Sequence, residues 1–257
     1  MKFCHFLFVT PKIMKDLSIL PTGVQTAFES WTQDLEVTFG DRLISAVIYD
    51  GIVKNDDARD TDSIRVMFVM SEMSVEILDV LREVCRRFKL AKQLQPFILT
   101  QEDLMTSTDV FPIRFLDMQQ DYILLCGKDV LKGLTIKRDH LRLRCEQEIK
   151  NSMLRLRTSY LMNLDLKGGI SRVMLRSYYT LLRSLDVLAE LKTGKTLRKA
   201  NEILSAATEM GLDITCLKRI AKLRDGDGFR GKDEEKKTYN ELMSLLTSAS
   251  ALADQMD

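Results

Sequence analysis

Five aspartates crowd the segment 50–62, which joins two apolar runs of this 257-residue chain. Carboxylate oxygens are the ligands that Mg²⁺ prefers, and a bound Mg²⁺ often holds the phosphates of a substrate. The segment therefore has the residue types of a metal and phosphate site. Clusters of Asp and Asn are equally typical of a solvated turn, because their side chains bond to nearby backbone groups. The five residues are Asp50, Asp56, Asp57, Asp60 and Asp62.

The runs on either side of this segment must position it. Leu43 to Tyr49 and Ile64 to Met70 are short, apolar and rich in β-branched residues, and Asp or Gly bounds them. This pattern is typical of buried strands rather than of helices. We expect a pair of interior strands joined by the acidic loop.

At these residues the chain resembles the nucleotidyltransferase superfamily, in which Gly-Ser follows a first strand and Ser-Asp-Ile-Asp opens a second. Asp50-Gly51 follows the first strand here, Lys54-Asn55 stands where Arg-Gly is common, and Asp62-Ser63-Ile64-Arg65 opens the second strand. The resemblance implies nucleotide contacts from Gly51, Lys54, Ser63 and Arg65. It also places Ser63 and Arg65 at the positions of the two metal-binding carboxylates.

The family's reaction uses carboxylates that hold two divalent cations against a triphosphate. Ser63 is a poor metal ligand, and the positive charge of Arg65 repels a cation. The same guanidinium is well suited to grip a phosphate directly. We therefore expect a protein without the usual metal-dependent catalysis, which acts by binding either a nucleotide or a protein partner. Arg65, Lys54 and the arginines of the bundle would carry any contact with phosphate.

A shifted register gives a second hypothesis, an active enzyme. Asp60-Thr61-Asp62 is itself an Asp-x-Asp motif, two to three residues earlier than the resemblance requires. Asp60 and Asp62 would then be the catalytic carboxylates that bind Mg²⁺, with Gly51 and Lys54 on the triphosphate. The resemblance would imply transfer of a nucleoside monophosphate to a hydroxyl group of an acceptor.

The rest of the chain carries a wider resemblance. Residues 109–134 and 139–161 are similar to a bacterial group of nucleotidyltransferase-like proteins, in which a helical domain follows the nucleotidyltransferase-fold domain. The arrangement also resembles the pairing of a minimal nucleotidyltransferase with a helical domain in some toxin–antitoxin systems and in aminoglycoside-modifying enzymes. It implies an α+β fold with a mixed β-sheet domain followed by an all-α helical bundle.

Periodicity and turn residues predict the same organisation. Apolar residues at helical spacing predict a helix after a Thr22 cap, and Val75, Leu78 and Leu81 predict another after a Ser74 cap. Further strands are expected near 96–100 and 122–126. After them we expect only helices, near 138–163, 170–192, 196–210, 213–224 and 233–255. Asp233 is the expected cap of the last helix. The expected divisions are an extension over 1–21, a nucleotidyltransferase-like domain over 22–135 and a helical bundle over 136–257.

The composition of the chain argues against several classes of function. The chain has two histidines, and its five cysteines are widely spaced without a Cys-x-x-Cys pair, which argues against a zinc site and a Ser-His-Asp triad. An odd number of unpaired cysteines favours a reducing compartment, so we expect a cytoplasmic protein. No apolar run reaches the length of a membrane span.

Charge and apolar patterning suggest partners for the bundle. Residues 1–136 hold 15 Lys and Arg against 20 Asp and Glu, whereas residues 137–257 hold 23 against 17. The basic residues of the bundle would line a cleft for a nucleotide or a nucleic acid, or lie on solvated faces beside acidic neighbours.

A third hypothesis for the function is a homodimer that forms through the apolar stripe of the last helix. This stripe consists of Leu242, Leu245, Leu246, Ala249 and Leu252.

Overall fold

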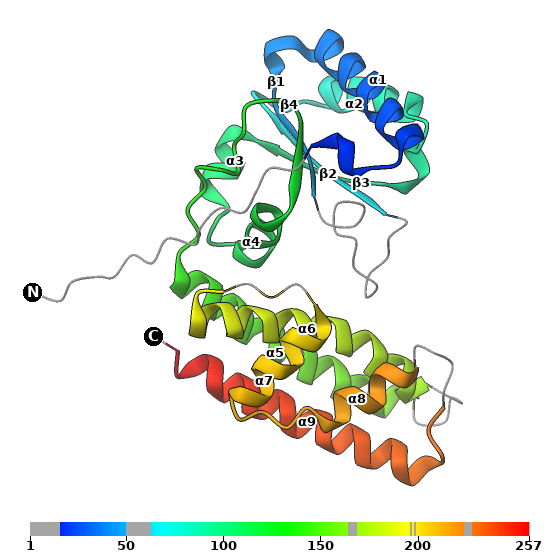
Figure 1. The fold of residues 1–257 in the computed structure, drawn as a ribbon, viewed down its shortest axis with the longest axis vertical. Helices are drawn as coiled ribbons and strands as arrows, with labels where there is room; N and C mark the ends of the chain where they lie inside the picture. The colour runs from blue at the N-terminus through cyan, green and yellow to red at the C-terminus, as the bar shows by residue number, and fades with distance from the viewer. Residues whose placement is uncertain are drawn as a thin grey trace, which may run out of the picture. The chain divides into compact units, whose positions relative to one another are not determined.

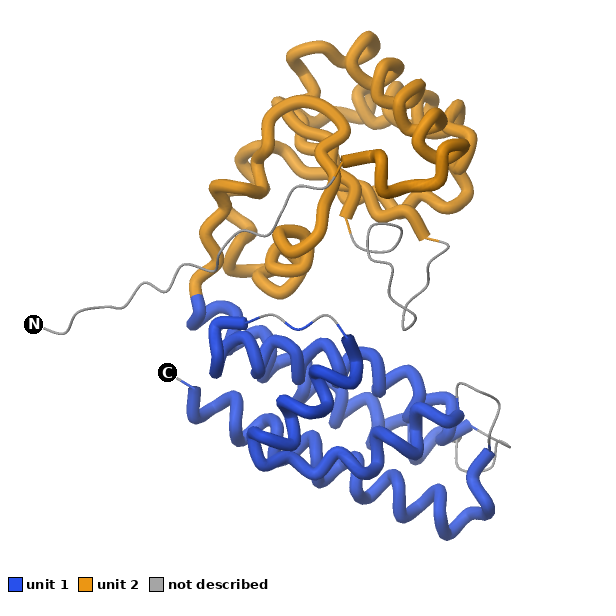
Figure 2. The backbone as a smooth tube through the Cα atoms, in the orientation of Figure 1, with its two compact units in different colours: residues 1–9, 138–257 blue, residues 10–137 orange. Residues whose placement is uncertain are grey.

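The structure is a computed structural model, which describes residues 16–49, 63–163, 169–195, 197, 199–223 and 228–256. These residues divide into two compact units, 16–137 and 138–256, which Figure 2 shows in two colours. The first unit contains every described strand, and the second is built from helices.

Four described strands form a mixed sheet in the first unit: β1 (Leu43–Tyr49), β2 (Ile64–Met70), β3 (Leu94–Thr100) and β4 (Tyr122–Gly127). Their order across the sheet is β3-β2-β1-β4 (Figure 1). β1 is antiparallel to both β2 and β4, whereas β3 is parallel to β2. The predicted strands 43–49 and 64–70 are thus confirmed at both ends, and the two central strands are buried along nearly their whole length.

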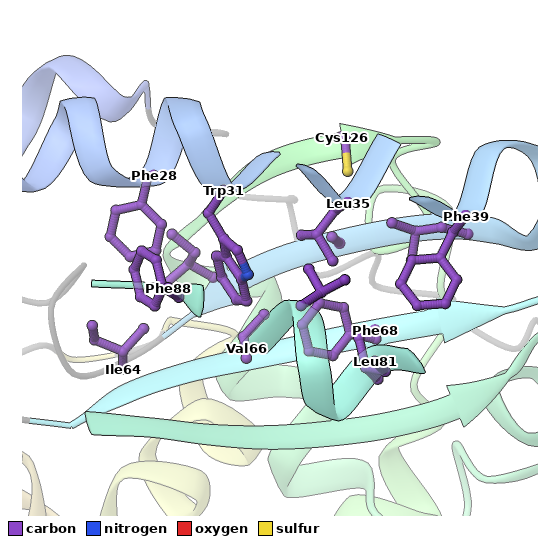
Figure 3. Packing of buried hydrophobic residues seen from close by; sticks show 14 of the residues in the cluster. Phe28, Trp31, Leu35, Phe39, Ile64, Val66, Phe68, Leu81, Phe88 and Cys126 are labelled. Carbon is purple, nitrogen blue, oxygen red and sulfur yellow. The ribbon is translucent and has the colours of Figure 1, made fainter. Parts of the chain in front are cut away.

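Helices α1 (Thr22–Phe39) and α2 (Val75–Arg87) cover one face of this sheet (Figure 1). Trp31 lies at the centre of the core between them, stacked on Phe88 at 4.3 Å between ring centroids and edge-on to Phe68 of β2 at 5.9 Å (Figure 3). Alternate residues of β1 and β2, such as Ile48 and Val66, complete this core because successive side chains of a strand point to opposite faces.

The other face of the sheet packs against α3 (Gln101–Thr106) and α4 (Pro112–Gln120). Val47 and Met67 of the central strands meet Leu104 of α3 and Phe115 of α4 there, and all four are buried. Both faces of the central strands are therefore covered, which explains why their sequences are apolar without alternation. Short 3₁₀ helices occupy Leu17–Ile19 (η1), Gly40–Arg42 (η2) and Ala91–Gln93 (η4).

Local details of the helix starts differ in part from the sequence-based expectations. Ser74 caps α2 as predicted, because its hydroxyl accepts a hydrogen bond from the Ile77 amide at 3.3 Å. The predicted cap Thr22 is wrong by one residue: Pro21, with φ −56° and ψ 141°, precedes the helix and Thr22 is its first residue. The predicted cap Asp233 is likewise in the first turn of the last helix, where its charge complements the helix dipole.

The second unit consists of α5 (Arg138–Asn163), α6 (Gly169–Thr193), α7 (Ala200–Glu209), α8 (Thr215–Lys222) and α9 (Lys232–Asp254). α5 packs along α6 and α9, while α7 and α8 pack on α6, and α8 also contacts α9. The predicted all-α second half is confirmed for the described residues. Leu242, Leu245, Leu246 and Ala249 of α9 are buried inside this unit and Leu252 is half-buried, so their stripe belongs to the bundle core rather than to a dimer surface.

Candidate functional site

The end of the sheet where β1 stops and β2 starts carries a row of four polar side chains. Tyr49 ends β1 and is paired with Arg65 of β2 on one side and with Tyr122 of β4 on the other. Arg65 is paired in turn with Gln95 of β3. Residues opposite one another share a face of the sheet, and this is the face that α3 and α4 cover, because Tyr49 and Tyr122 belong to its core.

Two of the six predicted site residues lie in this part of the structure. Ser63 immediately precedes β2 and is buried, and Arg65 is the second residue of that strand and half-buried. The Arg65 Nε donates a hydrogen bond to the Gln95 Oε1 at 3.4 Å. Arg65 is therefore fixed in the sheet and directed toward the neighbouring strand rather than spread along the surface.

The other four predicted site residues, Gly51, Lys54, Asp60 and Asp62, lie outside the described residues. So do Asp50, Asp56 and Asp57. Their assignment to the triphosphate or to Mg²⁺ remains a prediction. Within the described ranges, no three His, Cys, Asp or Glu side chains are grouped as they would be to hold a metal ion.

Arg114 is a component of this region that sequence reasoning missed. It belongs to α4, and its Nη2 donates to the Tyr49 hydroxyl at 3.4 Å while its guanidinium lies 3.9 Å from the centroid of the Phe97 ring. A guanidinium over an aromatic face is held by attraction to the ring quadrupole. Tyr49 is on β1 and Phe97 on β3, so Arg114 reaches across β2 on the face that also carries Arg65. In the sequence, Arg114 is distinguished by being the single basic residue of the mostly apolar segment 110–118.

Tyr122, at the β4 end of the row, is held by the loop that follows β4. Its hydroxyl donates to the Asp129 Oδ2 at 2.8 Å, and the Asp129 Oδ1 accepts from the Lys132 amide at 3.1 Å. Burial and the Asp129 carboxylate both raise the pKa of Tyr122, so the phenol stays neutral. The charged groups along the row are thus the guanidinium groups of Arg65 and Arg114 and, at the β4 end, the Asp129 carboxylate bonded to Tyr122. Guanidinium groups are well suited to bind an anion.

Part of the basic surface predicted for the bundle is neutralised within α5 and α6. Arg144 pairs with Glu148 at 2.6 Å and Arg142 with Glu146 at 3.6 Å, and Lys150 also pairs with Glu146. On α6, Arg183 pairs with the buried Asp186. All four basic residues are paired with acidic neighbours on their own helices, as the second interpretation expects, but the Arg183–Asp186 pair is largely buried rather than solvated. Arg155, Arg157, Arg172 and Arg176 lie on the same two helices.

The described cysteines form no disulfide: Cys126, Cys145 and Cys216 are buried and Cys85 is partly buried. Burial raises the pKa of the Cys145 thiol to about 12. Burial also raises the pKa of the Cys85, Cys126 and Cys216 thiols, and it therefore favours the protonated form of all four. Among the described helices, none combines the length and apolar character needed to cross a bilayer.

This strand order, with helices on both faces of the sheet and helices alone in the second unit, defines a nucleotidyltransferase-like α+β fold with a helical C-terminal part. The chain is similar in structure to the spectinomycin adenyltransferase AAD(9) from Enterococcus faecialis, solved with ATP and spectinomycin. The TM-score is 0.52 at 13% sequence identity, and the match covers 86% of this chain and 99% of the adenyltransferase chain. No family model matches the sequence, and no curated protein matches it.

Proposed function

We propose that this protein binds the phosphates of a nucleotide at the Arg65 end of the sheet and has lost the usual metal-dependent catalysis of its fold. The observation that carries the proposal is the placement of Arg65. It stands on β2 where the family resemblance puts a metal-binding carboxylate, with its Nε bonded to Gln95. A permanent positive charge at that position disfavours a divalent cation and favours a phosphate.

Arg114 supports the same function from the covering helix. Its contacts with Tyr49 and Phe97 hold a second guanidinium on the face that carries Arg65. Two arginines can share the charge of a triphosphate without a bridging metal, because each guanidinium presents several donors in a plane. The fold similarity to an adenyltransferase solved with ATP makes nucleoside triphosphates the first ligands to test.

The test is isothermal titration of ATP, GTP, CTP and UTP into the purified protein, each with and without Mg²⁺. We expect one or more nucleotides to bind without Mg²⁺, and Arg65→Gln to weaken that binding about tenfold or more, or roughly 1.4 kcal/mol. Arg86→Gln is the matched control, because Arg86 is an exposed arginine paired with Glu83 on the outer helix α2. If no nucleotide bound, the function would instead lie in a protein partner and the nucleotide proposal would be wrong.

The competing candidate is an active enzyme, favoured by the coverage of nearly the whole adenyltransferase chain. An acceptor hydroxyl would attack the α-phosphorus of a nucleoside triphosphate, lose its proton and release pyrophosphate, with Asp60 and Asp62 holding Mg²⁺. The assay is Mg²⁺-dependent pyrophosphate release from ATP, with spectinomycin as the first acceptor. Release that Asp62→Asn abolishes and Asp109→Asn leaves unchanged would overturn the loss of catalysis.

A further inference from the structure

The groove between α5 and α6 is a separate feature of the helical unit. It has a volume of about 570 Å³, within the range of small-molecule sites, and the two helices lie side by side along it (Figure 1). Its walls carry two arginines, four hydroxyl side chains and a few apolar groups. The residues that line it are Glu148, Leu154, Arg155, Thr158, Ser159, Val173, Arg176, Ser177 and Thr180.

The charge of this groove is positive and uncompensated within the described part of the chain. Arg155 and Arg176 form no ion pair there, in contrast to Arg144 and Arg183 on the same two helices. The one carboxylate in the groove, Glu148, is already paired with Arg144 at 2.6 Å. Two guanidinium groups on the walls of one groove repel each other unless an anion lies between them.

Arg155 is exposed to solvent and is tied to its own helix by a hydrogen bond. Its Nη2 donates to the Ser152 Oγ at 2.9 Å, and Ser152 is buried. The Ser152 hydroxyl donates its own proton to the Glu148 carbonyl at 2.9 Å, which leaves its oxygen free to accept from Arg155. This short chain of bonds fixes the arginine along α5 and leaves other donors of its guanidinium unoccupied.

We propose that the α5–α6 groove binds a phosphate-bearing small molecule, with Arg155 and Arg176 on the phosphate and the hydroxyls of Thr158 and Thr180 as further hydrogen-bonding groups. Guanidinium groups match phosphate oxygens with paired donors, and hydroxyls complete the oxygen shell. The apolar side chains of Leu154 and Val173 provide a surface against which an organic portion of the ligand can pack. This site is independent of the one at Arg65, which belongs to the other unit.

The experiment uses the full chain carrying Arg65→Gln, so that binding at the proposed nucleotide site is weakened. Pyrophosphate is titrated into ¹⁵N-labelled protein at constant ionic strength, and amide shifts are followed by NMR. We expect saturable shifts confined to residues 148–159 and 173–180. A parallel titration with ATP separates the two sources of phosphate: tighter binding than pyrophosphate indicates a nucleotide, and equal binding indicates recognition of phosphate alone.

Two double variants make the test specific. Arg155→Gln with Arg176→Gln should raise the Kd at least tenfold, whereas Arg157→Gln with Arg172→Gln should change it less than twofold. The second pair removes the same charge from the same helices but lies outside the groove lining. Shifts that fail to saturate, that lie elsewhere, or that respond equally to both pairs would overturn the proposal. Thermal unfolding of each variant establishes that it is folded.

Discussion

At the scale of single residues, the proposed function depends on Arg65. At its place on β2, a carboxylate would attract a divalent cation, whereas the guanidinium bonds to Gln95 and favours an anion. Arg114 adds a second guanidinium, held by Tyr49 and Phe97. Changes at these two arginines should therefore alter ligand affinity more than stability, because neither belongs to the apolar core.

Gly127 gives a prediction about stability at the same scale. It ends β4 with φ +81°, and a Cβ there would lie 2.2 Å from the Ile44 carbonyl oxygen. We expect Gly127→Ala to lower the free energy of unfolding by about 3 kcal/mol, because both the backbone conformation and the clash with β1 oppose a side chain. Chemical denaturation measures the change.

Gly211→Ala is the matched control for that experiment. Gly211 has a similar φ of +86°, but a Cβ there would meet nothing within 4 Å. Its substitution should cost only the conformational penalty, about 1 kcal/mol. If both variants lost the same free energy of unfolding, the close approach of β1 to Gly127 would not be the reason that a side chain is disfavoured there.

At the scale of elements, α3 has only six residues and depends on its first turn. The Thr100 hydroxyl accepts from the Asp103 amide at 3.0 Å, and the Asp103 carboxylate accepts from the Thr100 amide at 2.9 Å. This reciprocal pair is a capping box, which satisfies two amides that a helix start would otherwise leave without partners. α3 therefore stays folded against β3 although it is too short to be stable alone.

The capping box predicts a pH dependence. The hydrogen bonds from Thr100 lower the pKa of Asp103, so its stabilising effect is present above the ordinary aspartate pKa and is lost as pH falls through the lowered value. We expect Asp103→Asn to destabilise the protein at pH 7 and to have a smaller effect near pH 3. Urea unfolding at both pH values measures the difference. Asp109→Asn, an exposed aspartate outside any capping box, should show no such change; a pH-independent effect of Asp103→Asn would contradict the prediction.

At the scale of the whole molecule, the two units have separate cores. The sheet unit packs around Trp31 and Phe115 on its two faces, and the helical unit packs along α6 and α9. We predict that residues 138–257 fold as a helical domain when expressed alone, because α6 buries most of its side chains within that unit. Circular dichroism should show a helical spectrum and a cooperative thermal transition. A gradual transition, or a spectrum without helix, would show that the unit depends on residues 1–137.

The sequence by itself determined the elements and the fold class. Leu43–Tyr49 and Ile64–Met70 were predictable as strands because a strand buried on both faces is apolar at nearly every position. It did not determine every buried face: Val75 and Leu78 match the helical repeat of α2, yet they are 69% and 39% exposed, while Ile77 is buried. Which stripe of a helix is covered depends on where the sheet lies, and that is a tertiary property.

Only the tertiary structure decided which side chains meet at the site. Arg114 lies 65 residues from Tyr49 in sequence, and no local pattern records that its guanidinium reaches that hydroxyl. The pairing of Arg65 with Gln95 likewise follows from the parallel register of β2 and β3. The periodicity of apolar residues predicts which positions of one helix or strand are buried, because it depends only on residues that are close together in the chain. Contacts between elements depend on packing and register, so the sequence alone left them open.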